Sequence, residues 1–119
     1  MQYYHLEASL EVNALYNELF EAAERAAPKE MCGLIVQQGD KKVFIESQNF
    51  SEDPENSFKI DPKLYVKHQL LSNILYVVHS HYMQDCKPSQ ADKNNADFLK
   101  IPYMIVSYPD KEIEIYDPS

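Results

Sequence analysis

Two histidines one residue apart, with a serine and an aspartate soon after them, are the residues of this chain best suited to chemistry. His79 and His81 follow the apolar run 74–78, and Ser89 and Asp92 come next. In a β-strand, side chains at i and i+2 point to the same face, about 7 Å apart. Two imidazoles placed in this way can bind one zinc ion, and a carboxylate from the next element can supply a third ligand. The spacing therefore predicts a metal site with a fourth position open to water.

The segment after the histidines predicts the element that carries this carboxylate. Residues 89–99 are typical of a helix, with Ser89 at the N-cap. Asp92 then falls in the first turn, where a negative charge suits the helix dipole. Taken alone, His79 and His81 could also be polar residues with ordinary hydrogen bonds at the end of a strand. The long and chemically coherent spacing of the whole set favours the metal site.

The composition is typical of a globular domain. The chain has 119 residues, of which 45% are apolar and 25% charged, and we expect a single domain over residues 1–119. Its 19 acidic and 11 basic residues give a net charge of −8, so neither nucleic acid nor an anionic membrane is expected as a partner. The chain has no apolar run of about 18 residues and no signal-peptide pattern, which predicts a cytoplasmic location.

The two cysteines are expected to be free thiols. In a reducing compartment Cys32 and Cys86 do not make a disulfide framework, although a bridge between them is the minor alternative. Cys32 is expected to pack rather than to act as a nucleophile, and Gly33 to let backbone approach the site closely. Cys86 lies near the histidines in sequence, and its coordination of zinc as a soft ligand is a further minor alternative.

Hydrophobic periodicity and turn residues predict an alternation of helices and strands. Helices are expected at 9–26, 62–71 and 89–99, and strands at 31–37, 42–47, 74–79, 103–107 and 112–116. Residues 48–57 are typical of a polar loop, and 58–60 of a short extended piece. This order favours an α/β domain with a mixed sheet flanked by helices.

Several side chains outside the candidate site have expected places in this fold. The second helix is expected to start with Asp61 as N-cap and Pro62 as its first residue. Three of its apolar positions are predicted to face the core: Leu64, Val66 and either Leu70 or Leu71. The remaining histidines, His5 and His68, are expected at the surface or on a helix face. Three tyrosines are expected to pack in the core with their hydroxyls at its edge: Tyr76, Tyr103 and Tyr108.

Glu30 is the acidic residue best placed for proton transfer. A zinc hydrolase needs a group, most often a glutamate that is not itself a ligand, to move protons between water and the leaving amine. Glu30 immediately precedes the apolar strand 31–37, where a carboxylate can point into a cleft. The alternative is an ordinary solvated glutamate in a loop.

Together these residues resemble the JAMM (MPN-plus, JAB) metallopeptidase motif. The likeness is carried by Pro28, Glu30, Cys32-Gly33-Leu34, His79-Ser80-His81, Ser89 and Asp92. It is closest to the N-terminal peptidase domain of phage tail-assembly proteins, followed by bacterial peptidases that cleave ubiquitin-like sulfur carriers. The resemblance implies a curved mixed sheet in an α-β-α sandwich, similar to that of cytidine deaminases.

The resemblance also implies a role for each site residue. His79, His81 and Asp92 would bind one zinc ion together with a water molecule. Glu30 would be the general base and then the general acid, and Ser89 would donate a hydrogen bond to the water or to the oxyanion.

The implied function is zinc-dependent hydrolysis of a peptide or isopeptide bond in a protein substrate. The substrate would lie extended beside a sheet edge, and phage tail assembly, in the host cytoplasm, is the expected setting. The alternatives are a peptidase for a ubiquitin-like or sulfur-carrier protein, and a zinc-containing assembly or binding module without catalytic activity.

One departure from the family motif concerns the residue after the second histidine. The family usually has proline there, whereas this chain has Tyr82. The loop 82–87 is expected either to be more mobile or to offer an aromatic wall to the substrate. A zinc deaminase acting on a nucleobase is disfavoured, because its His-x-Glu and Cys-x-x-Cys elements are missing.

Overall fold

The computed structural model describes residues 10–118, with side chains from residue 12 onward. The elements are α1 (Leu10–Ala26), β1 (Cys32–Gln38), β2 (Lys41–Ser47), α2 (Pro62–Leu71), β3 (Asn73–Tyr82), α3 (Gln90–Leu99), β4 (Tyr103–Tyr108) and β5 (Ile113–Tyr116). His5 and the predicted helix start at position 9 lie outside the described residues. The predicted order of elements is confirmed from α1 to β5.

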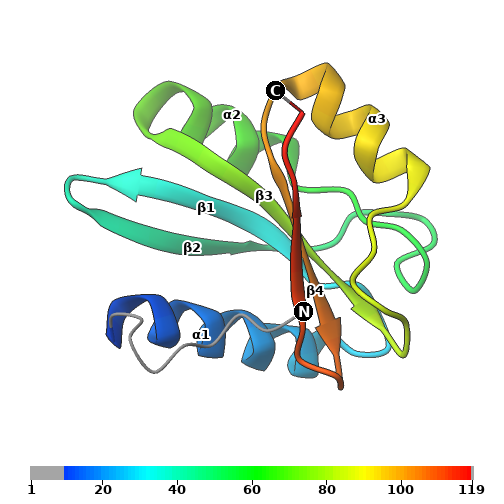
Figure 1. The fold of residues 1–119 in the computed structure, drawn as a ribbon. Coiled ribbons are helices and arrows are strands. Elements are labelled where there is room, and N and C mark those ends of the chain that lie inside the picture. Colours follow the sequence, from blue (N-terminus) through cyan, green and yellow to red (C-terminus); the bar gives the residue numbers. More distant parts are fainter. Residues whose placement is uncertain (1–9, 119) are drawn as a thin grey trace.

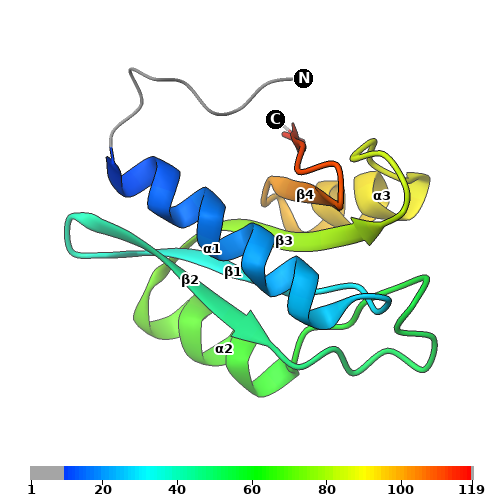
Figure 2. The same cartoon turned by 90° about the horizontal axis from the view of Figure 1, so that it is seen from below.

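The five strands form one mixed sheet in the order β2-β1-β3-β4-β5. β3 and β4 are parallel, and the other neighbouring pairs are antiparallel. Figure 1 shows α1 on one side of the sheet and α2 with α3 on the other, and in Figure 2 α1 crosses the near face. The predicted α/β architecture with a flanked mixed sheet is therefore confirmed.

Strand alternation divides the core between the two faces of the sheet. Two clusters of buried apolar side chains lie on opposite faces of the sheet. On β3, Val78 belongs to the cluster that includes the buried face of α1, and Val77 belongs to the cluster that includes Ala96 of α3. Because side chains at i and i+2 share a face, His79 and His81 fall on the same side as Val77. The sheet therefore presents both histidines to the face covered by α2 and α3.

β3 is longer than the sequence indicated. Its parallel pairing with β4 continues through His81 opposite Ser107 and Tyr82 opposite Tyr108. The predicted strand end at His79 is wrong by three residues, because pairing with a distant segment extends the strand. Both histidines consequently lie inside a paired strand.

The predicted buried face of α2 is wrong except at Leu64. Val66, Leu70 and Leu71 are 49%, 77% and 75% exposed, while Leu64 is half-buried. His68, expected at the surface or on a helix face, lies on the buried face of α2, and its Nδ1 is 3.3 Å from Ser72 Oγ. Leu64 and His68 are four residues apart and therefore share one helix face, and this face turns toward the protein.

The start of α2 agrees with its sequence signals. The Asp61 side chain accepts a hydrogen bond from the backbone N–H of Lys63 at 2.9 Å, and Pro62 is the first residue of the helix. The aspartate thus satisfies one of the unpaired N–H groups of the first turn. Local chemistry fixes this boundary even though it does not determine which face of α2 is buried.

The β1–β2 hairpin is confirmed, and it explains Gly33. A Cβ at this position would lie 2.7 Å from the Phe44 ring and would also collide with the carbonyl oxygen of Ile45. The backbone that approaches Gly33 closely is therefore that of β2, not that of the candidate metal site. The expectation for the role of this glycine is corrected accordingly.

The thiols and tyrosines mostly occupy their expected places. Cys32 and Cys86 are both free and buried, and burial raises the pKa of the Cys32 thiol to about 12. Tyr103 is buried, and Tyr76 and Tyr108 pack against the core from its edge.

Among the described residues, no helix is both long enough and apolar enough to span a membrane.

Candidate metal centre

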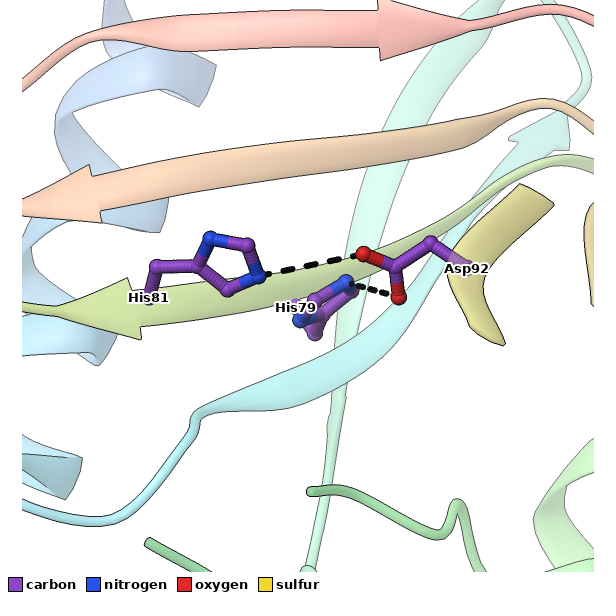
Figure 3. A group of neighbouring side chains, drawn as sticks. All are labelled: His79, His81 and Asp92. Atoms are coloured by element: carbon purple, nitrogen blue, oxygen red, sulfur yellow. Dashed lines mark ion pairs between the residues drawn. The ribbon is translucent and has the colours of Figure 1, made fainter. Parts of the chain in front are cut away.

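The histidines of β3 and the aspartate of α3 meet at one point. Potential ligand atoms of His79, His81 and Asp92 all lie within 4.8 Å of one another. His79 Nε2 is 2.8 Å from Asp92 Oδ1, and His81 Nε2 is 3.8 Å from Asp92 Oδ2 (Figure 3). The structure therefore brings together the three residues that the sequence predicted as metal ligands.

The N-terminus of α3 fixes the position of the Asp92 carboxylate. Ser89 Oγ accepts a hydrogen bond from the Asp92 N–H at 3.0 Å, and Asp92 Oδ2 accepts one from the Ser89 N–H at 2.8 Å. This reciprocal pair is a capping box, which satisfies two N–H groups of the helix start. The same bonds that begin the helix thus hold the carboxylate beside the histidines.

Each imidazole is also held through its other ring nitrogen. His79 Nδ1 lies 3.1 Å from Glu30 Oε1, and His81 Nδ1 lies 2.8 Å from the backbone oxygen of Asp85. An oxygen acceptor at Nδ1 favours a proton on that nitrogen, so that Nε2 can offer its lone pair to a metal ion. This is the arrangement by which proteins orient histidines that bind metals.

The buried charges of the site reinforce one another. Burial alone would lower the pKa of His79, but the Asp92 and Glu30 carboxylates outweigh it and raise the pKa to about 9. Burial alone would raise the pKa of the Asp92 carboxyl, but His79 and the hydrogen bonds from Ser89 outweigh this effect and hold the pKa below its usual value. A cation between these groups is therefore electrostatically favourable.

The residues present fit a zinc ion. His79 Nε2 is buried and faces Asp92 Oδ1 at 2.8 Å, so a cation, either a proton or a metal ion, must lie between the nitrogen and the carboxylate. A zinc ion shared by the two groups would take the place of that proton. Two imidazole nitrogens and one carboxylate oxygen are a ligand set typical of catalytic zinc sites. His79, His81 and Asp92 are thus the residues able to hold the metal.

Glu30 is not a solvated loop residue. Its side chain is buried. Its backbone N–H donates to the backbone oxygen of Pro54 at 2.7 Å, and its backbone oxygen accepts a hydrogen bond from Asn49 Nδ2 at 3.0 Å. The next residue, Met31, is bound to β3, because its N–H donates a hydrogen bond to Ser80 Oγ at 2.7 Å. These bonds hold the Glu30 backbone where the chain enters β1, so its carboxylate faces the site.

A cavity of about 160 Å³ opens onto these residues. Its lining includes Glu30, His79, His81, Ser89 and Asp92, together with Asn56, Ser57, Phe58, Gln84, Ala91 and Asn95. All five residues that the sequence singled out for the site therefore face one space. Whether they bind metal and react remains a prediction.

Among the described residues, neither an aromatic wall from Tyr82, the last residue of β3, nor a zinc ligand from Cys86 is found at this site. Tyr82 does not line this cavity, and its ring instead stacks against Tyr108 with centroids 6.3 Å apart. Gln84 is the residue of the loop that reaches the cavity. Cys86 is not part of the group of potential ligands among the described residues and packs with apolar side chains.

Phe58 is a site residue that the sequence reasoning missed. Its ring stacks on that of His79, with centroids 4.4 Å apart and planes 18° from parallel. The only signal was a phenylalanine at the start of the extended piece 58–60, directly after a polar loop. Periodicity cannot show that this loop folds back over β3, so the contact emerges only from the structure.

Comparison with known proteins identifies the fold family. A family model described as prokaryotic homologs of the JAB domain matches residues 12–116. The chain belongs to this family. This chain is also similar to the tail tip assembly protein K of Escherichia phage N15, at 29% identity over 91 residues that cover 76% of this chain. These residues make up 37% of the phage protein, so the chain spans little more than a third of that relative.

Solved structures agree on the fold of this JAB domain. A JAB1/MPN domain protein from Archaeoglobus fulgidus matches with a TM-score of 0.60 and 23% identity, covering 87% of this chain and 84% of that one. A Desulfitobacterium hafniense protein gives a TM-score of 0.64 and 24% identity, with coverages of 85% and 84%. A structure described as a metalloprotease-like zinc site (JAMM) in the proteasome and signalosome gives 0.52 and 24%, with coverages of 87% and 82%.

Proposed function

We propose that this JAB domain is a zinc metallopeptidase that hydrolyses a peptide or isopeptide bond in a protein substrate. The observation that carries the proposal is the meeting of His79, His81 and Asp92 at one cavity with a buried glutamate beside them. Family membership supports it, and so does the structural neighbour described as having a metalloprotease-like zinc site.

The proposed roles divide between binding and proton transfer. When bound, zinc supplies a Lewis acid that polarises the scissile carbonyl and lowers the pKa of water. Glu30 accepts a proton from the attacking water and returns it to the leaving amine. A carboxylate has two oxygens, so one can hold His79 Nδ1 while the other moves the proton.

Ser89 has a second role as a donor. Its Oγ accepts the capping hydrogen bond from Asp92, and this leaves the hydroxyl proton available to donate. Since Ser89 also lines the cavity, its hydroxyl can donate to the oxygen on which negative charge develops. Capping and catalysis are therefore compatible in one side chain.

The biological setting is proposed from the relative. The similarity to a tail tip assembly protein favours a substrate among phage tail proteins, and a ubiquitin-like or sulfur-carrier protein is the alternative substrate. Host cytoplasm is the proposed location. Cleavage of candidate tail proteins by the zinc-loaded chain, followed by mass spectrometry of the products, tests both the reaction and the substrate.

A non-catalytic zinc module is the second candidate. The contact of Glu30 with His79 is compatible with it, because a carboxylate that only orients a metal ligand makes this same contact. Replacing Glu30 by glutamine separates the two functions. The peptidase would lose cleavage while keeping zinc, whereas a binding module would be indifferent to the change.

A further inference from the structure

A second and more apolar cavity lies directly beside the candidate metal centre. It has a volume of about 340 Å³ and lies where α2, α3 and the segment 58–60 meet. Phe58 and Asn95 line both this groove and the smaller cavity that contains the histidines. The Phe58 ring, which stacks on His79, therefore forms part of the boundary between the two spaces.

The walls of the groove are apolar and open to solvent. Val66 of α2 is 49% exposed and Phe98 of α3 is 85% exposed, and both line it. Tyr103 forms part of the lining from the buried sheet, and its ring lies 6.0 Å from that of Phe58. Exposed apolar side chains that gather around one hollow mark a binding surface. The exposure of Val66, which contradicts the sequence prediction, follows naturally if this face of α2 binds a ligand.

The rim of the groove carries positive charge in an otherwise acidic chain. Lys59 lines the groove itself, and Lys63 and Lys67 line a shallow hollow that continues from it along α2 through Pro62 and Val66. Residues 59–67 contain one acidic residue, Asp61, and its side chain caps α2 by accepting a hydrogen bond from the Lys63 N–H. With a net charge of −8 for the chain, this local excess of lysine is complementary to an acidic partner.

We infer that this groove binds an extended segment of the protein substrate, with an apolar side chain in the hollow and an acidic neighbour at the lysines of α2. The inference rests on the proposed function and names the class of sequence that it acts on. An apolar anchor held next to the candidate centre would place the neighbouring peptide bond at the histidines. The groove is thus a determinant of specificity.

Peptide binding to the zinc-free Glu30→Gln chain, in which the proposed cleavage is suppressed, tests the inference. The probe is the acetylated peptide amide Ala-Glu-Leu-Glu-Ala, titrated into ¹⁵N-labelled protein while backbone NMR shifts are recorded. We expect saturable shifts at Val66 and Phe98. Replacing the leucine of the peptide by serine, or both glutamates by lysine, should weaken binding about tenfold or more, because apolar burial or charge complementarity is lost.

Matched variants assign the effect to the groove. Phe98→Ser and the double change Lys63→Glu with Lys67→Glu should each weaken binding about tenfold. Leu70→Ser is the control for the apolar change, because Leu70 is 77% exposed on α2 but does not line the groove. Lys41→Glu with Lys42→Glu, both exposed in the hairpin, is the control for charge. Neither control should change the affinity.

Three results would overturn the inference. They are the absence of shifts at millimolar peptide, shifts that the groove variants leave unchanged, and a concentration-dependent dimer that Phe98→Ser converts to monomer. The last result would assign the groove to a second copy of the chain. Because binding is read without zinc or cleavage, the proposed function can fail separately, through lack of zinc or of hydrolysis in the wild-type chain.

Discussion

Glu30 Oε1 lies 3.1 Å from His79 Nδ1, although 49 positions separate the two residues in the sequence. The contact joins the segment just before β1 to the C-terminal half of β3, and it connects the proposed proton-transfer group to a proposed zinc ligand. Glu30 therefore has two separable tasks. One is to accept a hydrogen bond, and the other is to carry a proton.

Substitutions at Glu30 should separate these tasks. In Glu30→Gln the amide oxygen can still accept from Nδ1–H, so zinc affinity should hold while cleavage falls about 10²- to 10⁴-fold. Glu30→Ala also removes the acceptor, and its zinc affinity should fall about 10- to 100-fold. Competition with a chromophoric chelator measures the affinity. Glutamine and alanine variants that lose zinc equally would contradict the account.

Ser89 should contribute to stability and to activity by different atoms. Ser89→Ala removes the cap of α3 and should cost about 1 kcal/mol of unfolding free energy, measured in urea. Ser89→Asn retains an oxygen that can cap the helix, so it should recover most of that stability. Since asparagine does not reproduce the hydroxyl donor, its cleavage rate should stay low. Full activity in the asparagine variant would exclude the donor role.

Gly33 should tolerate no side chain. In Gly33→Ala the new methyl group meets the Phe44 ring and the Ile45 carbonyl, which should destabilise the fold by about 1–3 kcal/mol. Gly39→Asn is the control, because a Cβ on Gly39 would meet no atom within 4 Å, and asparagine accepts the left-handed backbone found there, with a φ of 64°. Urea titration should show a clear loss in the first variant and little change in the second.

The stability of the zinc-free chain should depend on His79 at alkaline pH. Because the folded pKa of His79 is raised to about 9 from the usual 6.5, its protonated form stabilises the fold. This contribution is complete below about pH 6.5 and is lost as the pH rises through about 9. The unfolding free energy, measured with a chelator present, should fall over that range. His79→Asn should flatten this slope, and stability that instead rises with pH in the wild-type chain would contradict the assignment.

Local sequence signals predicted the parts of the fold that local chemistry determines. Asp61 and Ser89 cap their helices as expected, because each side chain bonds to an N–H within its own first turn. The hairpin also follows from its turn residues. The set His79, His81 and Asp92 could be recognised because strand period and helix start together dictate convergence.

Features that depend on distant partners were not predictable in this way. His68 is buried and Leu70 exposed because the sheet, not the helix, selects the face of α2 that docks. The stacking of Phe58 on His79 requires the loop before α2 to return across β3. The extension of β3 beyond His79 requires its pairing with β4. In each case the deciding contact comes from another segment of the chain.

The central claim is that His79, His81 and Asp92 bind one zinc ion, and direct metal analysis tests it. Protein prepared without added metal, then dialysed against a slight excess of zinc and finally against zinc-free buffer, should contain about one zinc per wild-type chain. His79→Ala and Asp92→Ala should contain almost none. His68→Asn, which changes a buried histidine outside the site, should bind zinc like the wild type. A wild-type chain without zinc, or equal zinc in all of these variants, would contradict the account.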